Sequence, residues 1–417
     1  MSESTIERPG EVQTYEVGGV RMARPFKIRR FGHFGYNLEH LEDGVTFYTD
    51  ELGFRITDDM NLFEMVPAEA VDWARSIVTN PRMLFTTNSS DHHALLLSHK
   101  SFGTLFGNDA VANDNTVSQI TWQVGTLDEV MDAVAYLRNH GVQVGHTGRD
   151  MPGSNWHVYF LDPDGNNVEL YYGIEQIGWD RTSKPVPMHY RGFHTEPERP
   201  QMSEAAEIRE AQDRGIDIHS GWRPNETHLD EMYDVGGVLL PRPFKVTVLG
   251  PFSLFTDNLD RMLDFYTTVM GFQLTEETHY DGRRILFLRH GTEHHSLVLI
   301  DKTLRATLGL KPDASCLSVG MQLGSYRQLL DAVEFFRSHG REIIELPPEL
   351  HLGIDYAAHV RDPDGHLVQL YYRIEHLGWD GRPRPADLRP SITQPWPHAV
   401  DTQPDTYVGQ TYLGPLG

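Results

Sequence analysis

The chain has 417 residues, enough for two domains, and its 39% hydrophobic and 23% charged residues are typical of globular proteins. A formal net charge of −23 opposes binding to nucleic acid and to anionic lipid surfaces. The single cysteine, Cys316, excludes a disulfide within the chain, residues 1–12 lack the apolar core of an export signal, and no run approaches the ~18 apolar residues of a membrane-spanning helix. We therefore expect a cytoplasmic protein that binds neither nucleic acid nor membranes.

Apolar periodicity predicts strands and amphipathic helices in a regular order along the first part of the chain. Leu41, Val45, Tyr48 and Leu52 fall at helical spacing, and Gly53 follows as a helix stop. The predicted elements, in chain order, are a strand at 32–38, a helix at 41–51, strands at 82–87 and 93–99, a strand at 119–124, a helix at 127–139, and strands at 157–161 and 167–172. This order indicates two successive βαβββ units.

The whole pattern occurs twice. The segment YEVGGVRMARPFK from Tyr15 matches YDVGGVLLPRPFK from Tyr233, and LDPDGNNVELYY from Leu161 matches RDPDGHLVQLYY from Arg361. In the shared Asp-Pro-Asp-Gly motif, proline fixes φ and glycine permits positive φ, which predicts a tight turn before the last strand. The repeat divides the chain into four parts: a first module at 13–182, a connecting arm at 183–230, a second module at 231–382 and a proline-rich tail at 383–417.

Paired βαβββ units with a histidine in the first strand, an FYxxxLGF helix end and a final DPDGxxxEL strand resemble the vicinal oxygen chelate superfamily. Its members include type I extradiol ring-cleaving dioxygenases, glyoxalase I, methylmalonyl-CoA epimerase and fosfomycin-resistance proteins. The resemblance implies an α+β fold in which each module curls two βαβββ units into an open, cup-like barrel. It also implies inward-pointing metal ligands on the first strand of each unit and on the last strand of the second. We expect the second module to act as a scaffold and to form the interface of a homo-oligomer.

On these ligand strands the first module carries His33, Gln119 and Glu169. The corresponding positions of the second module hold weaker donors, namely Pro251, Ser318 and Gln369. The resemblance therefore implies one divalent metal ion, in the first module. Extradiol enzymes hold Fe(II) with two histidines and one carboxylate, so that neighbouring coordination positions stay open. Gln119 replaces the second histidine with a neutral and weaker amide donor, which leaves Mn(II), Ni(II) and Zn(II) as alternatives to Fe(II).

Three further residues stand where the extradiol enzymes carry groups that act on the substrate. His93, in SDHHALLLSHK, corresponds to an acid/base histidine, and strand alternation would place it on one face with Leu95, Leu97 and His99. Tyr159 corresponds to a tyrosine that donates hydrogen bonds to the substrate and to oxygen intermediates. Asp150 stands where the extradiol motif Gly-Arg-His has its histidine.

Other features of the sequence limit these assignments. The second module has its own histidine pair, His294 and His295, but lacks the ligands. A structural role is therefore the alternative to a catalytic role for the pair in the first module. Leu97 stands where glyoxalase I and the epimerase have an additional ligand, and leucine cannot coordinate a metal. If Gln119 is not a ligand, the nearest substitutes are His93, His99 and His157.

Three functions are consistent with this pattern. The first is a metal-dependent dioxygenase that cleaves a catechol-like aromatic diol with dioxygen. The second is a non-redox lyase, isomerase or hydrolase whose metal stabilises an enolate, which Gln119 and Asp150 favour. The third is a protein that binds an aromatic compound or an antibiotic without metal. Oxygen uptake, turnover without oxygen, and binding without metal distinguish the three.

Overall fold

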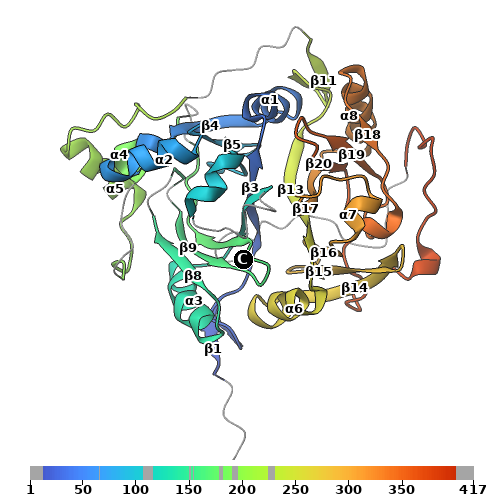
Figure 1. The fold of residues 1–417 in the computed structure, drawn as a ribbon, viewed down its shortest axis with the longest axis horizontal. Helices are drawn as coiled ribbons and strands as arrows, with labels where there is room; N and C mark the ends of the chain where they lie inside the picture. The colour runs from blue at the N-terminus through green and yellow to red at the C-terminus, as the bar shows by residue number, and fades with distance from the viewer. Residues whose placement is uncertain are drawn as a thin grey trace, which may run out of the picture.

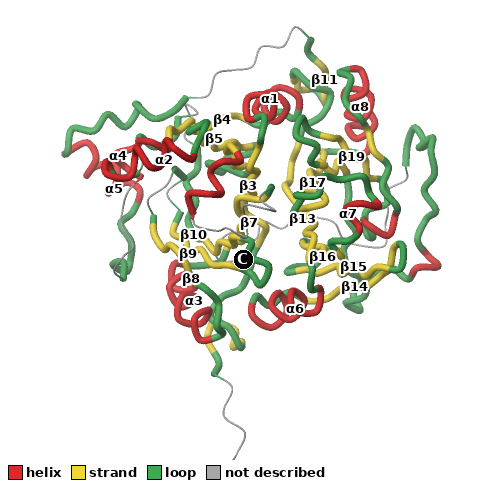
Figure 2. The backbone as a smooth tube through the Cα atoms, in the orientation of Figure 1, coloured by secondary structure: helices red, strands yellow, loops and turns green. Residues whose placement is uncertain are grey.

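The computed structural model describes residues 13–64, 66–106, 116–149, 152–153, 155–177, 182–189, 196–223 and 231–400. Each module is built on one eight-stranded mixed sheet, and the two sheets lie side by side (Figure 1). The strands occupy the centre of the molecule and most helices lie around them, as Figure 2 shows. The predicted α+β architecture with two repeated modules is confirmed. In the described part of the chain, no helix combines the length and hydropathy needed to cross a bilayer.

The elements of the first module follow the predicted order. They are β1 (Tyr15–Val17), β2 (Val20–Met22), β3 (Arg30–Leu38), α1 (Leu41–Thr46), β4 (Arg55–Asn61), α2 (Val71–Ile77), β5 (Arg82–Thr87), β6 (Leu95–His99), β7 (Val117–Gln123), α3 (Leu127–Asn139), β8 (Val144–Gly148), β9 (Trp156–Leu161) and β10 (Asn167–Tyr172). The strand order in the sheet is β4-β5-β6-β3-β7-β10-β9-β8, which places the first strands of the two units, β3 and β7, at its centre.

The second module repeats this order after a connecting arm. The arm contains α4 (Val186–His189) and α5 (Glu204–Asp213). The second module contains β11 (Tyr233–Val235), β12 (Val238–Leu240), β13 (Val246–Thr256), α6 (Leu259–Asp264), β14 (Gln273–Tyr280), β15 (Arg283–Arg289), β16 (Leu297–Asp301), α7 (Leu304–Thr307), β17 (Cys316–Leu323), α8 (Tyr326–Ser338), β18 (Ile343–Ile344), β19 (Ala357–Arg361) and β20 (Leu367–Tyr371). Its sheet order, β14-β15-β16-β13-β17-β20-β19-β18, is that of the first module.

Local chemistry explains where the prediction succeeds and where it is incomplete. Helix α1 continues as a π-helical turn to Glu51, and Gly53 takes φ +89°, so the predicted helix stop is confirmed. The predicted βαβββ units include strands β4 and β8, but the sequence did not locate them, and strands β1 and β2 and helix α2 were not predicted. An irregular register between Ile56 and Asp58 breaks the apolar alternation of β4, and β8 is a short edge strand with little apolar side chain.

The two modules share one hydrophobic core. The rings of Phe34 on β3 and Phe252 on β13 have centroids 4.5 Å apart at the junction of the sheets. Helical segments of the two modules also contact each other. Phe47, after α1, packs against Phe336 of α8 with ring centroids 6.0 Å apart, and the Tyr136 hydroxyl of α3 donates to the Val269 carbonyl at 3.3 Å. A continuous buried cluster therefore contains residues of both modules.

The Asp-Pro-Asp-Gly turns make a reciprocal pair of buried contacts across this junction. The Tyr48 hydroxyl of the first module donates to Asp362 Oδ2 of the second at 3.0 Å. The Tyr266 hydroxyl of the second module donates to Asp162 Oδ2 of the first at 3.1 Å. Each turn is thus fixed by the helical segment of the other module.

The connecting arm and the described part of the tail are packed against the modules. Glu207 of α5 accepts a hydrogen bond from Arg149 at 2.6 Å, and both side chains are buried. In the tail, Arg389 donates to Glu276 of β14 at 2.6 Å, and the Pro397 carbonyl accepts from Tyr326 of α8 at 2.7 Å. Both segments therefore cover the modules over the described residues.

The reciprocal tyrosines give a first test of the shared core. We expect Tyr48→Phe and Tyr266→Phe each to lower the free energy of unfolding by about 1.5–3 kcal/mol, because each removes a donor from a buried carboxylate. Denaturant unfolding followed by fluorescence measures the change. Tyr233→Phe is the matched control, since its hydroxyl bonds Glu231 at the surface and the change should stay within about 0.5 kcal/mol. Equal effects in all three variants would contradict the importance of the turn contacts.

Candidate metal centre

Strand alternation in β10 sends two sets of side chains to opposite faces of the first sheet. Val168 and Leu170 enter the shared core, so Glu169 and Tyr171 point to the other face. Glu169 pairs with Thr121 of parallel β7 and with Tyr159 of antiparallel β9. The face of the sheet opposite the shared core therefore collects polar side chains from three adjacent strands.

His33 and Glu169 form the centre of this face. Nε2 of His33 lies 3.0 Å from Oε2 of Glu169, with both side chains almost fully buried. The Asn155 amide donates to the other carboxylate oxygen of Glu169 at 2.7 Å. Thr121 Oγ1 accepts from the His33 backbone N–H at 2.6 Å and donates to the His33 carbonyl at 2.7 Å, which fixes the backbone at a bulge in β3.

Electrostatics keep the Glu169 carboxyl charged despite its burial. Burial acts to raise its pKa, but the electrostatic influence of His33, the hydrogen bond with His33 and a hydrogen bond from Tyr159 outweigh it and lower the pKa. His93 shows the opposite balance. Burial and the neighbouring His33 and His92 lower the pKa of His93 well below its ordinary value, so its ring is neutral at pH 7.

Gln119 lies on the same face of the sheet as the central pair. On β7 it stands two residues before Thr121, whose position is opposite Glu169, and its partner on β3 is Gly35. Its side chain is buried, and its amide makes no hydrogen bond to the residues that the structure describes. Gln119 is thus placed on the correct strand and face to complete a ligand set.

The donors fit a divalent cation. Two ligand atoms that each lie about 2.1 Å from one ion, with a ligand–ion–ligand angle of about 90°, are about 3.0 Å apart. His33 Nε2 and Glu169 Oε2 have this separation. No cluster of three histidine, cysteine or acidic side chains suited to a metal occurs among the described residues. A third protein ligand among these residues would therefore be a donor of another kind, such as the amide oxygen of Gln119.

The other predicted histidines differ in their distance from this centre. The His93 ring lies 4.2 Å from the His33 ring between centroids, and His157 contributes to the field at Glu169. His99 instead pairs with Leu38 at the far end of β3, about 13 Å along the strand from Phe34, and bonds Ser101. His99 is therefore not part of the centre.

The expectation that strand alternation places His93 on one face with Leu95, Leu97 and His99 is wrong. Strand β6 begins only at Leu95, so His93 lies in the preceding turn. Leu95 and Leu97 enter the shared core, whereas His93 packs against Phe85 at 5.0 Å, and that ring belongs to a separate hydrophobic cluster. Asp150 lies outside the described residues.

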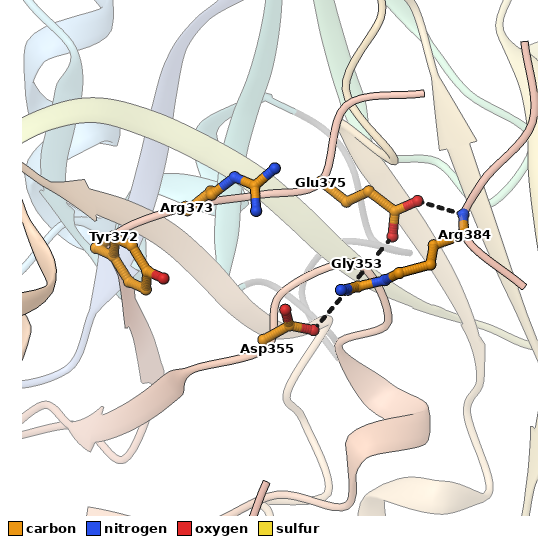
Figure 3. A pocket seen from close by; sticks show the side chains of 6 residues that line it. All are labelled: Gly353, Asp355, Tyr372, Arg373, Glu375 and Arg384. Atoms are coloured by element: carbon orange, nitrogen blue, oxygen red, sulfur yellow. Dashed lines mark hydrogen bonds and ion pairs between the residues drawn. The ribbon is translucent and has the colours of Figure 1, made fainter. Parts of the chain in front are cut away.

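The second module repeats this arrangement without the ionic pair. Ser318 and Gln369 occupy the ligand strands, and the Gln369 amide lies 3.2 Å from Nε2 of His359, a neutral contact in place of the His–Glu pair. Elsewhere in this module, Arg384 bonds Asp355 at 2.7 Å and lies 3.7 Å from Glu375 at a small pocket (Figure 3). The donors of this module are weaker, as the sequence predicts.

Comparison with known proteins identifies the family of the chain. A sequence model of the Glyoxalase/Bleomycin resistance protein/Dioxygenase superfamily matches residues 30–170 and 248–370. The chain therefore belongs to this superfamily, through both of its modules.

Individual relatives are distant. Catechol-2,3-dioxygenase of Bacillus subtilis (strain 168) is 23% identical over 270 residues, which cover 64% of this chain and 74% of that protein. The fold is similar to homoprotocatechuate 2,3-dioxygenase from Brevibacterium fuscum in complex with 3,4-dihydroxyphenylacetate, with a TM-score of 0.53, 16% identity, and coverage of 87% of this chain and 86% of that one. It is also similar to the Mn(II)-bound glyoxalase from Novosphingobium aromaticivorans, with a TM-score of 0.50, 13% identity and 85% coverage of each chain.

The centre predicts how metal binding responds to substitution. We expect one equivalent of Fe(II) or Mn(II) per chain, loss of binding in Glu169→Ala, and a smaller loss in Gln119→Ala, because water can replace a neutral donor but not a charge. Equilibrium dialysis of metal-free protein, followed by elemental analysis, measures the content. Gln369→Ala in the second module is the control and should bind as the parent does. Two tightly bound equivalents, or normal binding by Glu169→Ala, would contradict the assignment.

Proposed function

We propose that this protein is a metal-dependent dioxygenase that opens the ring of a catechol-like aromatic diol. The observation that carries the proposal is the buried pair of His33 and Glu169, with the neutral ring of His93 in contact with His33 and with Tyr159 directly opposite Glu169. The similarity to catechol-2,3-dioxygenase of Bacillus subtilis supports the same reaction class.

In this proposal His33, Glu169 and Gln119 hold the metal. When bound, a divalent ion, Fe(II) here, would supply Lewis acidity toward the two diol oxygens and redox chemistry with dioxygen. Glu169 contributes the negative charge of the ligand set, and Asn155 orients its carboxylate by donating to Oε1.

The surrounding residues act on protons and on water. The neutral His93 ring can accept the proton that a diol hydroxyl loses on binding, and can return it to the product later. Tyr159 on β9, whose hydroxyl donates to Glu169, can accept a hydrogen bond from a substrate hydroxyl beside that carboxylate. Burial of the His33 and Glu169 side chains keeps bulk water from the reacting atoms, which strengthens every polar interaction among them.

A second candidate, a non-redox lyase, isomerase or hydrolase, is favoured by one observation. Gln119 places a neutral amide on the strand where a second imidazole would stand, and such a donor set suits a metal that acts only as a Lewis acid. This activity would turn over substrate equally under air and under argon.

Oxygen consumption tests the leading proposal. With a panel of catechols the Fe(II)-loaded protein should consume oxygen and form a coloured, conjugated product, and His93→Ala should slow the chemical step by roughly 10²- to 10⁴-fold. His295→Ala, the equivalent change in the second module, should retain the parent rate. Turnover that is unaffected by argon would overturn the dioxygenase assignment, and a His93→Ala enzyme at full rate would make that histidine structural.

Gln119→His tests the role of the amide. The substitution recreates two histidines and one carboxylate, so affinity for Fe(II) should rise and dioxygenase activity should be retained or gained. Anaerobic Fe(II) titration and oxygen uptake measure the two effects. A weaker Fe(II) affinity in this variant would show that residue 119 does not face the metal.

A further inference from the structure

Three buried side chains of the first module form a hydrogen-bonded chain that ends beside His33. Asp58 of β4 lies with Oδ2 2.7 Å from Nε2 of His92. Nδ1 of His92 lies 3.0 Å from Nδ1 of His93, and the His93 ring in turn contacts His33. All three members are at least nine-tenths buried, so water does not compete for these bonds.

We propose that Asp58 is a positioning residue which, through His92, fixes the His93 tautomer that carries its proton on Nδ1 and leaves Nε2 as an acceptor. A carboxylate can only accept, so His92 donates from Nε2 and, when neutral, has a bare Nδ1. His93 must then donate from its own Nδ1 to bridge the pair. The catalytic meaning of this tautomer rests on the proposed function, because it makes His93 a base toward a diol hydroxyl.

The surroundings hold the two rings in this contact. Gly153, at φ +93°, lies beneath the junction, where an added Cβ would fall 2.9 Å from Nδ1 of His93 and 3.3 Å from Nδ1 of His92. Only glycine therefore leaves room for the bridging hydrogen bond. The Glu175 carbonyl accepts from the His92 backbone N–H at 2.9 Å, which anchors the start of the pair.

The acceptor atom of His93 is available to a ligand. No described residue forms a hydrogen bond with its Nε2, and the ring packs against both Phe85 and His33. A proton that passes from a substrate hydroxyl to Nε2 leaves a phenolate on the substrate and an imidazolium on His93. The negative charge of Asp58, which bonds the intervening His92, stabilises that imidazolium electrostatically.

The second module supplies an internal comparison. His294 and His295 repeat the Nδ1 to Nδ1 contact at 3.0 Å, and Glu276 takes the place of Asp58 at 3.1 Å from His294. Pro251 stands there in place of His33, so this chain ends beside no ligand. The chain of bonds is thus common to both modules, and only the copy in the first module adjoins the candidate centre.

Two measurements on the same variants test the proposal. In metal-free protein with ¹⁵N-labelled histidine, the His93 signals, assigned by their loss in His93→Gln, should show the proton on Nδ1. Asp58→Asn, whose amide can donate to His92, should move the proton to Nε2, and Asp58→Glu, which imitates the second module, should restore it. Oxygen uptake by the Fe(II)-loaded variants should show kcat reduced roughly 10²- to 10⁴-fold in Asp58→Asn with KM unchanged, and recovered in Asp58→Glu.

Glu276→Gln is the matched control and should alter neither the His93 signals nor kcat. A proton on Nε2 of His93 in the parent would overturn the proposal, and this measurement does not depend on whether Asp58→Asn folds. A parental kcat in Asp58→Asn would overturn it too. If the parent consumes no oxygen with any diol, the proposed function fails, while the tautomer measured in metal-free protein still decides the role of Asp58.

Discussion

The burial of one negative charge governs the arrangement of the first module. A carboxylate without compensation inside a protein costs several kcal/mol, and Glu169 is completely buried. Three partners stabilise this charge: His33 at one carboxylate oxygen, Asn155 at the other, and Tyr159 on the neighbouring strand. Each partner comes from a different segment, so the central strands and the turn before β9 are held in register by the same carboxylate. A bound cation would add to this compensation.

The repeat shows which features belong to the fold and which to the centre. Both modules keep the turn aspartates, the tyrosines that bond them, and the paired histidines with an acid behind them. Only the first module keeps a charged pair on the ligand strands, and the second has the neutral contact of Gln369 with His359. Features common to both copies belong to the fold, and the acid–histidine–histidine chain gains a further role only in the first copy, where it adjoins His33.

The sequence predicts the fold well because apolar periodicity and the internal repeat mark the strands and helices directly. The site depends instead on contacts between side chains from separate segments, which periodicity does not reveal. The strands that carry His33 and Glu169 follow from apolar alternation and the repeat. Asn155 and Thr121 give no signal, because one is a loop donor and the other resembles any strand threonine. Asp58 could have been found, since the repeat aligns it with Glu276 and both acids precede a histidine pair. The predicted orientation of His93 is wrong because strand alternation was applied to residues that precede Leu95, where β6 begins.

The shared core limits which substitutions the second module can accept during evolution. Since Phe252, Tyr266 and Asp362 of the second module complete the interior of the first, a truncated chain would expose apolar surface and leave buried polar groups without partners. The second module lacks the charged ligand pair but is still constrained as a structural partner. Substitutions there should be selected through folding yield and cellular abundance, whereas substitutions around Glu169 are selected through chemistry.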